Sequence, residues 1–322
     1  MPCKAPKFWW KKPGLAATAL RPAAAIYNAV ASARHKLTAP YQPLVPVICV
    51  GNVVAGGAGK TPATQALTQL LFSENITRFP AIVLRGYGGT LDGPTTVDPN
   101  VHSYKDVGDE ALMHARCAPT VISRDRAAGV KLAQLSGADF VFMDDGLQNP
   151  SVIKRLSFLV VDSVQGIGNG LTLPAGPLRE PLADALAKTD AIILVGDAMP
   201  FDANKPVFSA QIVPDTAVDI TRPFVAFAGL GRPEKFRETL QWVGANVLSF
   251  HAFPDHHPYK DSDIEKLIHE ANEKQAVLIT TEKDYMRIPE KFRGDVEFFP
   301  VRLAFDDPRA VLRFIRDRLA PR

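Results

Sequence analysis

One glycine-rich stretch, Gly51–Pro62 (GNVVAGGAGKTP), constrains the fold of this chain more than any other. The run before it, Val45–Val50, is rich in β-branched residues and predicts a strand, and Ala63–Leu71 after it predicts a helix. Strand, glycine loop and helix start are the setting of a phosphate-binding loop, whose backbone N–H groups face an anion. The alternative is a chance Gly-Lys-Thr in an ordinary loop, since Val54 stands where the usual pattern has its first glycine.

A phosphate-binding loop assigns a role to each of its polar side chains. Lys60 would reach the β- and γ-phosphates and take part in catalysis, and the Thr61 hydroxyl would ligate Mg²⁺. We expect nucleotide contacts along the second half of the loop, from Gly56, Gly57, Ala58, Gly59, Lys60, Thr61 and Pro62.

Composition describes a folded protein with room for two domains. The chain has 322 residues, of which 46% are hydrophobic and 22% charged. A net charge of +3 is too small to indicate a nucleic-acid partner. The three cysteines form no CxxC pair, which favours a reducing compartment. No apolar run is long enough to predict a membrane-spanning helix, and no signal peptide is recognisable.

Strand-like and helix-like patterns alternate along the first two-thirds of the chain, which predicts a mostly parallel sheet flanked by helices. The expected strands are Val45–Val50, Pro80–Leu84, Thr120–Ile122, Phe140–Met143, Phe158–Val161 and Ala191–Val195, with helices at Glu110–Cys117 and Arg124–Ser136. Prolines then punctuate the chain. We expect an N-terminal helical segment (1–40), a nucleotide-binding domain (41–205), a linker (206–222) and a smaller α/β domain (223–322).

The smaller domain repeats the alternation of strands and helices. Its expected strands are Pro223–Ala228, Asn246–Phe250, Ala276–Thr280 and Val296–Pro300, and its expected helices are Glu234–Val243, Asp261–Glu273 and Pro308–Leu319.

Two groups of acids follow predicted strands or open predicted helices. Asp144 and Asp145 end a buried run, where an acid beside a phosphate-binding loop usually holds Mg²⁺, and a turn with capping aspartates is the alternative. Asp109 precedes a helical pattern, so it is either a helix N-cap or a carboxylate that accepts a proton from an attacking hydroxyl.

Arginine and histidine motifs add further candidates. Arg179, in a proline-bounded loop with Glu180, could meet a phosphate or make a structural ion pair, and Arg85 offers another cation. Residues 251–259 contain three histidines and an acid, which fits a metal site, a plain turn, or a histidine that tunes a base. His114 has no such context and receives no role.

The N-terminal segment combines aromatic and basic residues. Residues 1–40 carry seven Lys and Arg and no acid, and Phe8, Trp9 and Trp10 stand beside two lysines. Helical spacing from Leu15 to Val30 is interrupted by Pro22, which predicts two pieces or a kink. Such a segment suits a membrane interface, or packs on the parent domain.

The motifs in this order resemble the tetraacyldisaccharide 4′-kinase family, the lipid A 4′-kinases. The resemblance covers about residues 8–284, and its most specific motif is the Leu-Pro-Ala-Gly-Pro-Leu-Arg-Glu-Pro run. The motifs that carry it are Gly51-Asn52, Gly56–Pro62, Arg85–Gly88, Gly108–Glu110, Asp144–Gln148, Gly168–Gly170, Pro174–Pro181, Phe253–His256 and Thr280–Asp284. The family also lacks the first glycine of the usual loop, so Val54 fits it.

This resemblance implies an ATP- and Mg²⁺-dependent kinase that phosphorylates the 4′-hydroxyl of a tetraacylated glucosamine disaccharide 1-phosphate, giving a lipid IVA-type product. It implies that Asp109 is the catalytic base and works with His256. It further implies a peripheral or monotopic protein, expected to be a monomer, at the cytoplasmic face of a bacterial inner membrane. There Phe8, Trp9 and Trp10 would contact lipid. Substrate contacts are expected from Asn52, Arg85, Tyr87, Arg179 and Glu180.

One position departs from the family, and two rival functions remain as alternatives. Asn149 stands where the family usually has histidine, so it receives no catalytic role. A P-loop NTPase switch or regulator at the membrane would need a guanine-reading motif, which residues 281–284 do not supply. A non-catalytic membrane adaptor would not depend on Lys60.

Overall fold

The chain folds into two compact units. The structure is a computed structural model and describes residues 5–215 and 218–320. Within these residues the larger unit comprises 5–212 and 303–320, and the smaller unit comprises 213–302. Each unit has its own apolar core, so each is described by itself.

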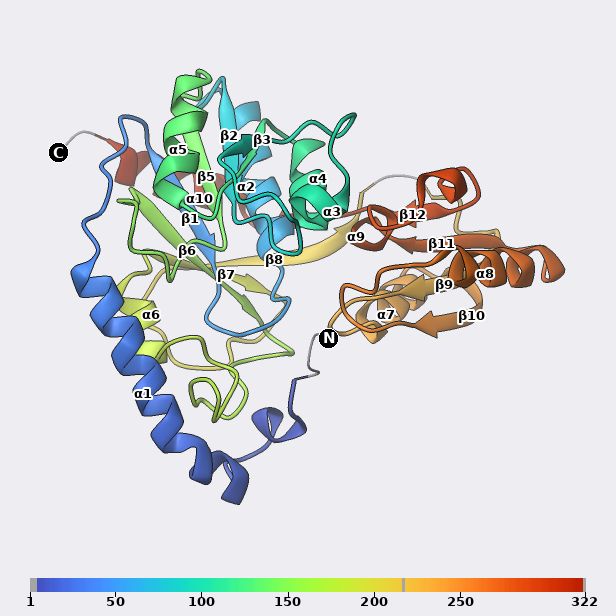
Figure 1. Cartoon of the computed structure of the whole chain (residues 1–322), viewed down its shortest axis with the longest axis horizontal. Helices are drawn as coiled ribbons and strands as arrows, with labels where there is room; N and C mark the ends of the chain where they lie inside the picture. Colours follow the sequence, from blue (N-terminus) through green and yellow to red (C-terminus); the bar gives the residue numbers. More distant parts are fainter. Residues whose placement is uncertain (1–4, 216–217, 321–322) are drawn as a thin grey trace. The chain divides into compact units, whose positions relative to one another are not determined.

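A single sheet runs through the larger unit (Figure 1). Its strands are β1 (Val47–Gly51), β2 (Pro80–Leu84), β3 (Thr95–Thr96), β4 (Thr120–Ile122), β5 (Phe140–Asp144), β6 (Leu156–Asp162), β7 (Ala191–Val195), β8 (Val207–Pro214) and β13 (Val301–Phe305). Their order is β13-β8-β7-β6-β1-β5-β2-β4-β3. Neighbouring strands are parallel from β8 to β4, whereas β3 is antiparallel to β4. The predicted mostly parallel α/β sheet is confirmed.

Successive residues of the central strand β1 supply the cores on the two faces of this sheet. Val47 and Cys49 belong to one apolar cluster, and Ile48 and Val50 belong to the other, as the two-residue period of a strand requires. The second cluster includes residues of α2 (Lys60–Ser73) and α10 (Pro308–Leu319). The first includes residues of α5 (Arg126–Leu135) and α6 (Leu182–Ala187). Helices therefore cover both faces, and the carboxyl ends of the strands remain for a ligand.

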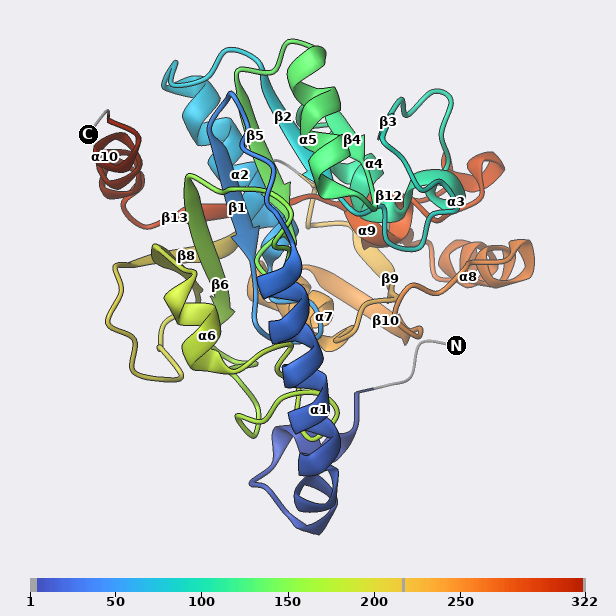
Figure 2. The same cartoon turned by 60° about the vertical axis from the view of Figure 1, so that its left-hand side comes forward.

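The N-terminal helix α1 (Leu15–Leu37) is one continuous element (Figure 2), so of the two alternatives predicted at Pro22, two pieces or a kink, the two-piece alternative is wrong. Alanines on both sides of the proline are the strongest helix formers, and they carry the helix through despite one lost hydrogen bond. A 3₁₀ turn, η1 (Lys7–Trp10), precedes α1. In the part of the chain that the structure describes, no helix has both the length and the apolarity that a membrane crossing needs.

The two remaining short helices of the larger unit are α3 (Tyr104–Val107) and α4 (Asp109–Ala115), which follow one another around Gly108.

The smaller unit contains a second parallel sheet, in the order β10-β9-β11-β12. Its strands are β9 (Pro223–Ala228), β10 (Asn246–Ala252), β11 (Val277–Thr281) and β12 (Glu297–Phe299). Its helices are α7 (Glu234–Trp242), α8 (Asp261–Glu273), α9 (Glu282–Tyr285) and the 3₁₀ turn η2 (Glu290–Phe292).

The unit boundaries differ from the expected domain limits at both ends of the smaller unit. Residues 207–214, expected within a linker, form β8 of the large sheet. Residues 303–320, expected in the smaller domain, belong to the larger unit. The reason is burial, because Val311, Leu312 and Ile315 of the amphipathic helix α10 join the core of the large sheet.

Candidate functional site

The glycine loop leaves the carboxyl end of β1 and opens the helix α2. Gly59 is the N-cap of α2 with φ 86°, a left-handed conformation that favours glycine. A second loop holds the glycine loop in place, since the Ala55 N–H donates to the Pro177 carbonyl (2.8 Å) and the Arg179 N–H donates to the Val53 carbonyl (2.7 Å). Backbone N–H groups at the start of a helix without intrahelical partners are the kind that face anions in other proteins.

Both aspartates at the end of β5 meet the start of α2. The Thr61 hydroxyl donates to Oδ2 of Asp144 (3.1 Å), and Lys60 Nζ lies 3.9 Å from Oδ1 of Asp145. Asp144 is the last residue of β5, and Asp145 turns out of the strand with φ 56°. This left-handed residue allows both acids to serve one site, although consecutive strand residues would face opposite sides.

Arg179 neutralises Asp145 in this structure. Its Nη1 donates to Oδ1 (2.7 Å) and Oδ2 (2.8 Å) of that carboxylate. Burial by the surrounding protein opposes ionisation of Asp145, but the charges of Lys60 and Arg179 outweigh it and hold its pKa below the usual range. The carboxylate is therefore ionised at neutral pH, with the cations Lys60 and Arg179 beside it.

Arg126 is a further cation of this site that the sequence did not reveal. It is 4% exposed, and its Nη1 donates to the Ser123 carbonyl (2.6 Å). Burial lowers its pKa to about 10, against the charges of Asp145 and Asp144, which raise it. Locally it is an ordinary first residue of a helix capped by Asp125, so its sequence context contains no signal.

Asp109 is the buried first residue of α4, 3% exposed. The N-cap is Gly108, so Asp109 is not the capping residue, although its Oδ1 accepts the Glu110 N–H (2.9 Å). The Arg85–Gly89 loop packs beside it, because a Cβ on Gly108 would lie 2.3 Å from the Tyr87 carbonyl oxygen. Within that loop the side chains of Arg85 and Tyr87 are exposed.

Asn52 and Glu180 are joined through Gln148. Gln148 Nε2 donates to the Asn52 carbonyl (2.9 Å) and to Glu180 Oε1 (3.0 Å), and Lys188 forms an ion pair with Glu180. Asn52 is fully buried, and no described residue bonds its Oδ1. Glu180 thus fixes the loop geometry, while its neighbour Arg179 contacts Asp145.

The smaller unit holds His256 in a clamped loop. His256 has φ 53°, its N–H donates to the Gly229 carbonyl (3.2 Å), and its Nε2 lies 3.3 Å from Lys283 Nζ. Buried Arg287 donates to the carbonyls of Gly229 (3.0 Å) and His257 (3.1 Å). The loop is therefore tied to the Thr-Glu-Lys-Asp segment that begins at residue 281.

Two of the three histidines of residues 251–259 bond to acids of α8. His251 contacts Glu270 (2.7 Å) and His257 contacts Asp263 (3.1 Å). In residues 5–215 and 218–320 no group of three or more His, Cys, Asp or Glu side chains is arranged to hold a metal. The metal-site interpretation of this segment therefore has no support.

The donor set near Thr61 fits a metal shared with a nucleotide. Asp144 is 2% exposed, and within the described residues its Oδ1 has no hydrogen-bond partner. A buried carboxylate oxygen left without a partner is costly unless a cation or water meets it. Mg²⁺ is commonly held by one or two carboxylates together with substrate phosphates, so few protein ligands are needed.

The aromatic residues of η1 lie on the loop that precedes Arg179. The indole N–H of Trp9 donates to the Pro174 carbonyl (3.1 Å), and the Asn169 N–H donates to the Trp9 carbonyl (2.7 Å). Phe8 and Trp9 are half-buried, whereas Trp10 is 38% exposed.

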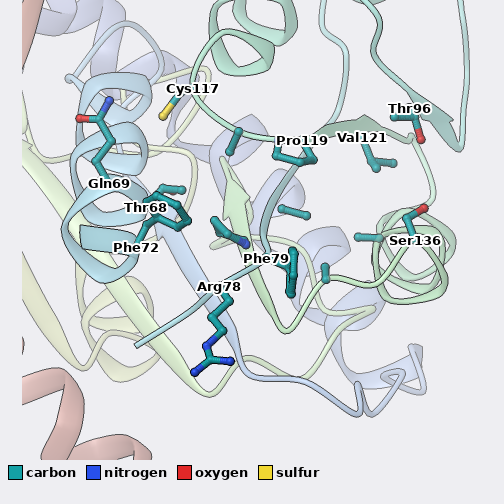
Figure 3. A pocket seen from close by; sticks show the side chains of 15 residues that line it. Thr68, Gln69, Phe72, Arg78, Phe79, Thr96, Cys117, Pro119, Val121 and Ser136 are labelled. Atoms are coloured by element: carbon teal, nitrogen blue, oxygen red, sulfur yellow. The ribbon is translucent and has the colours of Figure 1, made fainter. Parts of the chain in front are cut away.

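A cavity of about 300 Å³ lies away from these residues (Figure 3). It is lined by the last turns of α2 and α5 and by residues that precede or begin β2 and β4, including Phe72, Phe79 and Pro119. The glycine loop follows the carboxyl end of β1, whereas this cavity is lined by residues at the other end of the sheet.

The family model LpxK, described as tetraacyldisaccharide-1-P 4'-kinase, matches residues 16–320. The chain belongs to this family. The resemblance found in its motifs is confirmed.

Relatives of the tetraacyldisaccharide 4'-kinase family align along nearly the whole chain. The tetraacyldisaccharide 4'-kinase of Bradyrhizobium sp. (strain ORS 278) is 44% identical over 330 residues, 98% of each chain. That of Methylorubrum extorquens (strain PA1) is 46% identical and covers 93% of this chain and 94% of its own. A crystal structure of LpxK from Aquifex aeolicus in complex with ATP is similar with a TM-score of 0.78 and 27% identity, over 94% of this chain and 99% of the other.

Proposed function

We propose that this chain transfers the γ-phosphoryl group of ATP to the 4′-hydroxyl of a tetraacylated glucosamine disaccharide 1-phosphate, as a 4'-kinase of lipid A biosynthesis. The observation that carries the proposal is the meeting of Lys60, Thr61 and two aspartates at the start of α2, in a chain that belongs to this family along residues 16–320. An NTPase switch and an adaptor lack such support.

The donor half of the reaction uses the cations around Asp145. Lys60 and Arg179 contact this carboxylate in the structure, and bound phosphates would compete for both side chains. Arg179 presents a planar fork that suits bidentate contact with phosphate oxygens. Thr61 and Asp144, with Asp145, would hold Mg²⁺, and the ion would neutralise negative charge that develops on the transferred phosphoryl group.

The acceptor half requires a base for the sugar hydroxyl. Asp109 is a buried carboxylate at a helix start, and we assign it this role, with His256 orienting it and sharing the proton as the family resemblance implies. Asn52, Arg85, Tyr87, Arg179 and Glu180 are the proposed contacts of the disaccharide and its phosphate.

Moving a substrate with four acyl chains out of the bilayer costs about 0.8 kcal/mol of free energy per CH₂ group. The enzyme must therefore act at the membrane surface. The N-terminal segment supports this. Leu15 is 92% exposed, Ile26 67% and Val30 65%, and only Ala17 and Ala24 of α1 are buried. We therefore propose that Phe8, Trp9, Trp10 and the apolar residues of α1 dock on the inner membrane, and that the enzyme acts as a monomer.

Product analysis tests the reaction. Purified protein with ATP, Mg²⁺ and the lipid disaccharide should give a product heavier by one phosphoryl group in mass spectrometry, and Lys60→Ala should abolish it. ATP hydrolysis that ignores the lipid would instead indicate a switch. Product formed equally well by Lys60→Ala would refute the donor site.

Asp109→Asn tests the base. Loss of a general base typically costs 10²–10⁴-fold, so kcat should fall by two or more orders of magnitude while ATP affinity stays nearly unchanged. If kcat falls only a few-fold, the Asp109 carboxylate serves only to accept the backbone N–H of Glu110 at the start of α4. If Asp109 and His256 act together, the double variant that also carries His256→Ala should lose little further kcat.

Liposome sedimentation tests the membrane surface. A variant with Leu15→Ser, Ile26→Ser and Val30→Ser should bind anionic vesicles more weakly than wild type. The matched control is Leu135→Ser, since Leu135 is 86% exposed on α5, outside the N-terminal segment. If the α1 variant and the Leu135→Ser control bind vesicles equally well, the proposed membrane contact is wrong and α1 serves to pack on the larger unit.

A further inference from the structure

His114 lies at the centre of the site, although no motif includes it. Its side chain is fully buried on α4, and its Nε2 is 2.7 Å from Oδ2 of Asp144. A carboxylate only accepts, so the ring donates from Nε2. Within the described residues Nδ1 has no partner, which agrees with a proton placed on Nε2.

Asp144 Oδ2 is thereby bonded from two directions. Thr61 of α2 donates to it (3.1 Å) and His114 of α4 donates to it (2.7 Å), while Oδ1 is the oxygen without a protein partner. Two donors on one oxygen fix the rotation of the carboxylate. They leave Oδ1 as the oxygen for a cation or its water.

Helix α4 also connects this carboxylate to the proposed base. Asp109 begins α4 and His114 is five residues further on, about 7.5 Å along the axis. A second contact joins α4 to α2, where Gln65 Nε2 donates to the Met113 carbonyl (3.3 Å). The bond from His114 to Asp144 therefore ties α4, which carries the proposed base Asp109, to β5, which carries the proposed metal ligand Asp144.

We propose that His114 is a positioning residue for the nucleotide-bound Mg²⁺, acting through Asp144. The proposal rests on the proposed function, in which Asp144 is a ligand of the metal. Partners that orient metal ligands typically contribute 10- to 100-fold to metal affinity. A histidine that only fills the core beneath α4 would contribute to folding and leave the metal dependence unchanged.

Three substitutions separate these roles. His114→Gln can place its amide Nε2 near the position of the imidazole Nε2, His114→Asn is too short to reach Asp144, and His114→Leu keeps apolar volume without a donor. The matched control is His251→Leu, which removes an equally short bond, to Glu270 in the smaller unit (2.7 Å).

The experiment measures binding of a non-hydrolysable ATP analogue by the full-length protein while Mg²⁺ is titrated, with circular dichroism to verify folding. We expect the Mg²⁺ half-saturation concentration to rise about 10- to 100-fold in His114→Leu and His114→Asn. It should stay within about 3-fold of wild type in His114→Gln and His251→Leu, and binding without Mg²⁺ should be similar in all folded proteins.

The outcomes decide the proposal. Unchanged half-saturation in His114→Asn, or an equal loss in His114→Gln and His114→Asn, overturns it. If His114→Leu does not fold, the Gln and Asn variants still give the decisive comparison. A wild-type protein that binds the analogue without any Mg²⁺ dependence, or forms no phosphorylated lipid, contradicts the proposed function instead.

Discussion

Asp284 is the best place to measure what a buried charge contributes to this protein. Its Oδ1 accepts from the Gly229 N–H (2.9 Å), the Tyr259 hydroxyl (2.8 Å) and Arg287 Nη2 (2.5 Å), and its Oδ2 accepts from Thr281 (2.6 Å). Burial and the charge of Asp284 raise the pKa of the Tyr259 hydroxyl, which keeps it a donor. The same group of residues clamps the loop that carries His256.

Asp284→Asn keeps the shape and an acceptor oxygen and removes the charge. Arg287, whose side chain is 2% exposed, then loses the charge of its partner Asp284. Removing one partner of a buried pair costs about 3–5 kcal/mol. Since 1.4 kcal/mol is a factor of ten, the equilibrium constant for opening the smaller unit should rise roughly 100- to 4,000-fold.

Hydrogen exchange measured by mass spectrometry follows this opening in peptides from residues 218–302. Glu297→Gln is the control, because it removes the same kind of charge from a surface pair with Arg222 (2.8 Å; 37% and 46% exposed). Surface pairs contribute about 0–1 kcal/mol, so exchange should change less than about 5-fold. The reasoning is refuted if the two variants exchange alike, or if Asp284→Asn also accelerates exchange in β1 and α2.

Three further outcomes follow from burial and charge. Hydrogen bonds from Lys274 and Ser249 lower the pKa of Glu270 from 4.5 to about 2, so the stability that its charge contributes is present above about pH 4.5 and is lost as the pH falls toward 2. Urea unfolding should therefore show the advantage of wild type over Glu270→Gln disappearing across that range, and a constant advantage would contradict the assignment. Gly51→Ala would place a Cβ 2.5 Å from the Cβ of Leu147, and this overpacking should destabilise the protein by about 1–3 kcal/mol and weaken nucleotide binding, measured by unfolding and titration. Burial raises the pKa of the Cys49 thiol to about 11, so iodoacetamide at pH 8 should label half-buried Cys117 before Cys49 in peptide mass spectrometry, and equal labelling of these two residues would contradict it.

The local sequence predicts the limits of a helix or strand well where a proline or a charged residue interrupts the apolar pattern. Pro80 and Arg85 bound β2, and the strand observed there, Pro80–Leu84, has the predicted limits. Helix α8 also has its predicted limits, Asp261–Glu273. What the pattern could not assign is the partner of an amphipathic helix. The apolar stripe of α10 predicts burial, but it matches either core equally well.

The same division holds in the site. The meeting of Asp144 with Thr61 follows from the rule that ligands bind at the carboxyl ends of parallel strands. His114 and Arg126 were missed because their roles arise between segments distant in sequence: His114 bonds Asp144, and the charge of Arg126 interacts with those of Asp144 and Asp145. A histidine inside a short helix looks the same in sequence whether it faces a core or a carboxylate.

The smaller unit is an insertion in the larger one, because it lies in the chain between β8 and β13 at one edge of the large sheet. The chain leaves through β8 and returns through β13, and these two strands are neighbours. An excision between them would therefore need only a short turn to reconnect the sheet, while α10 would still complete its core. The smaller unit, which carries His256, is thus separable at the level of the gene, and the larger unit would keep Lys60, Thr61, Asp144 and Asp109 together in one protein.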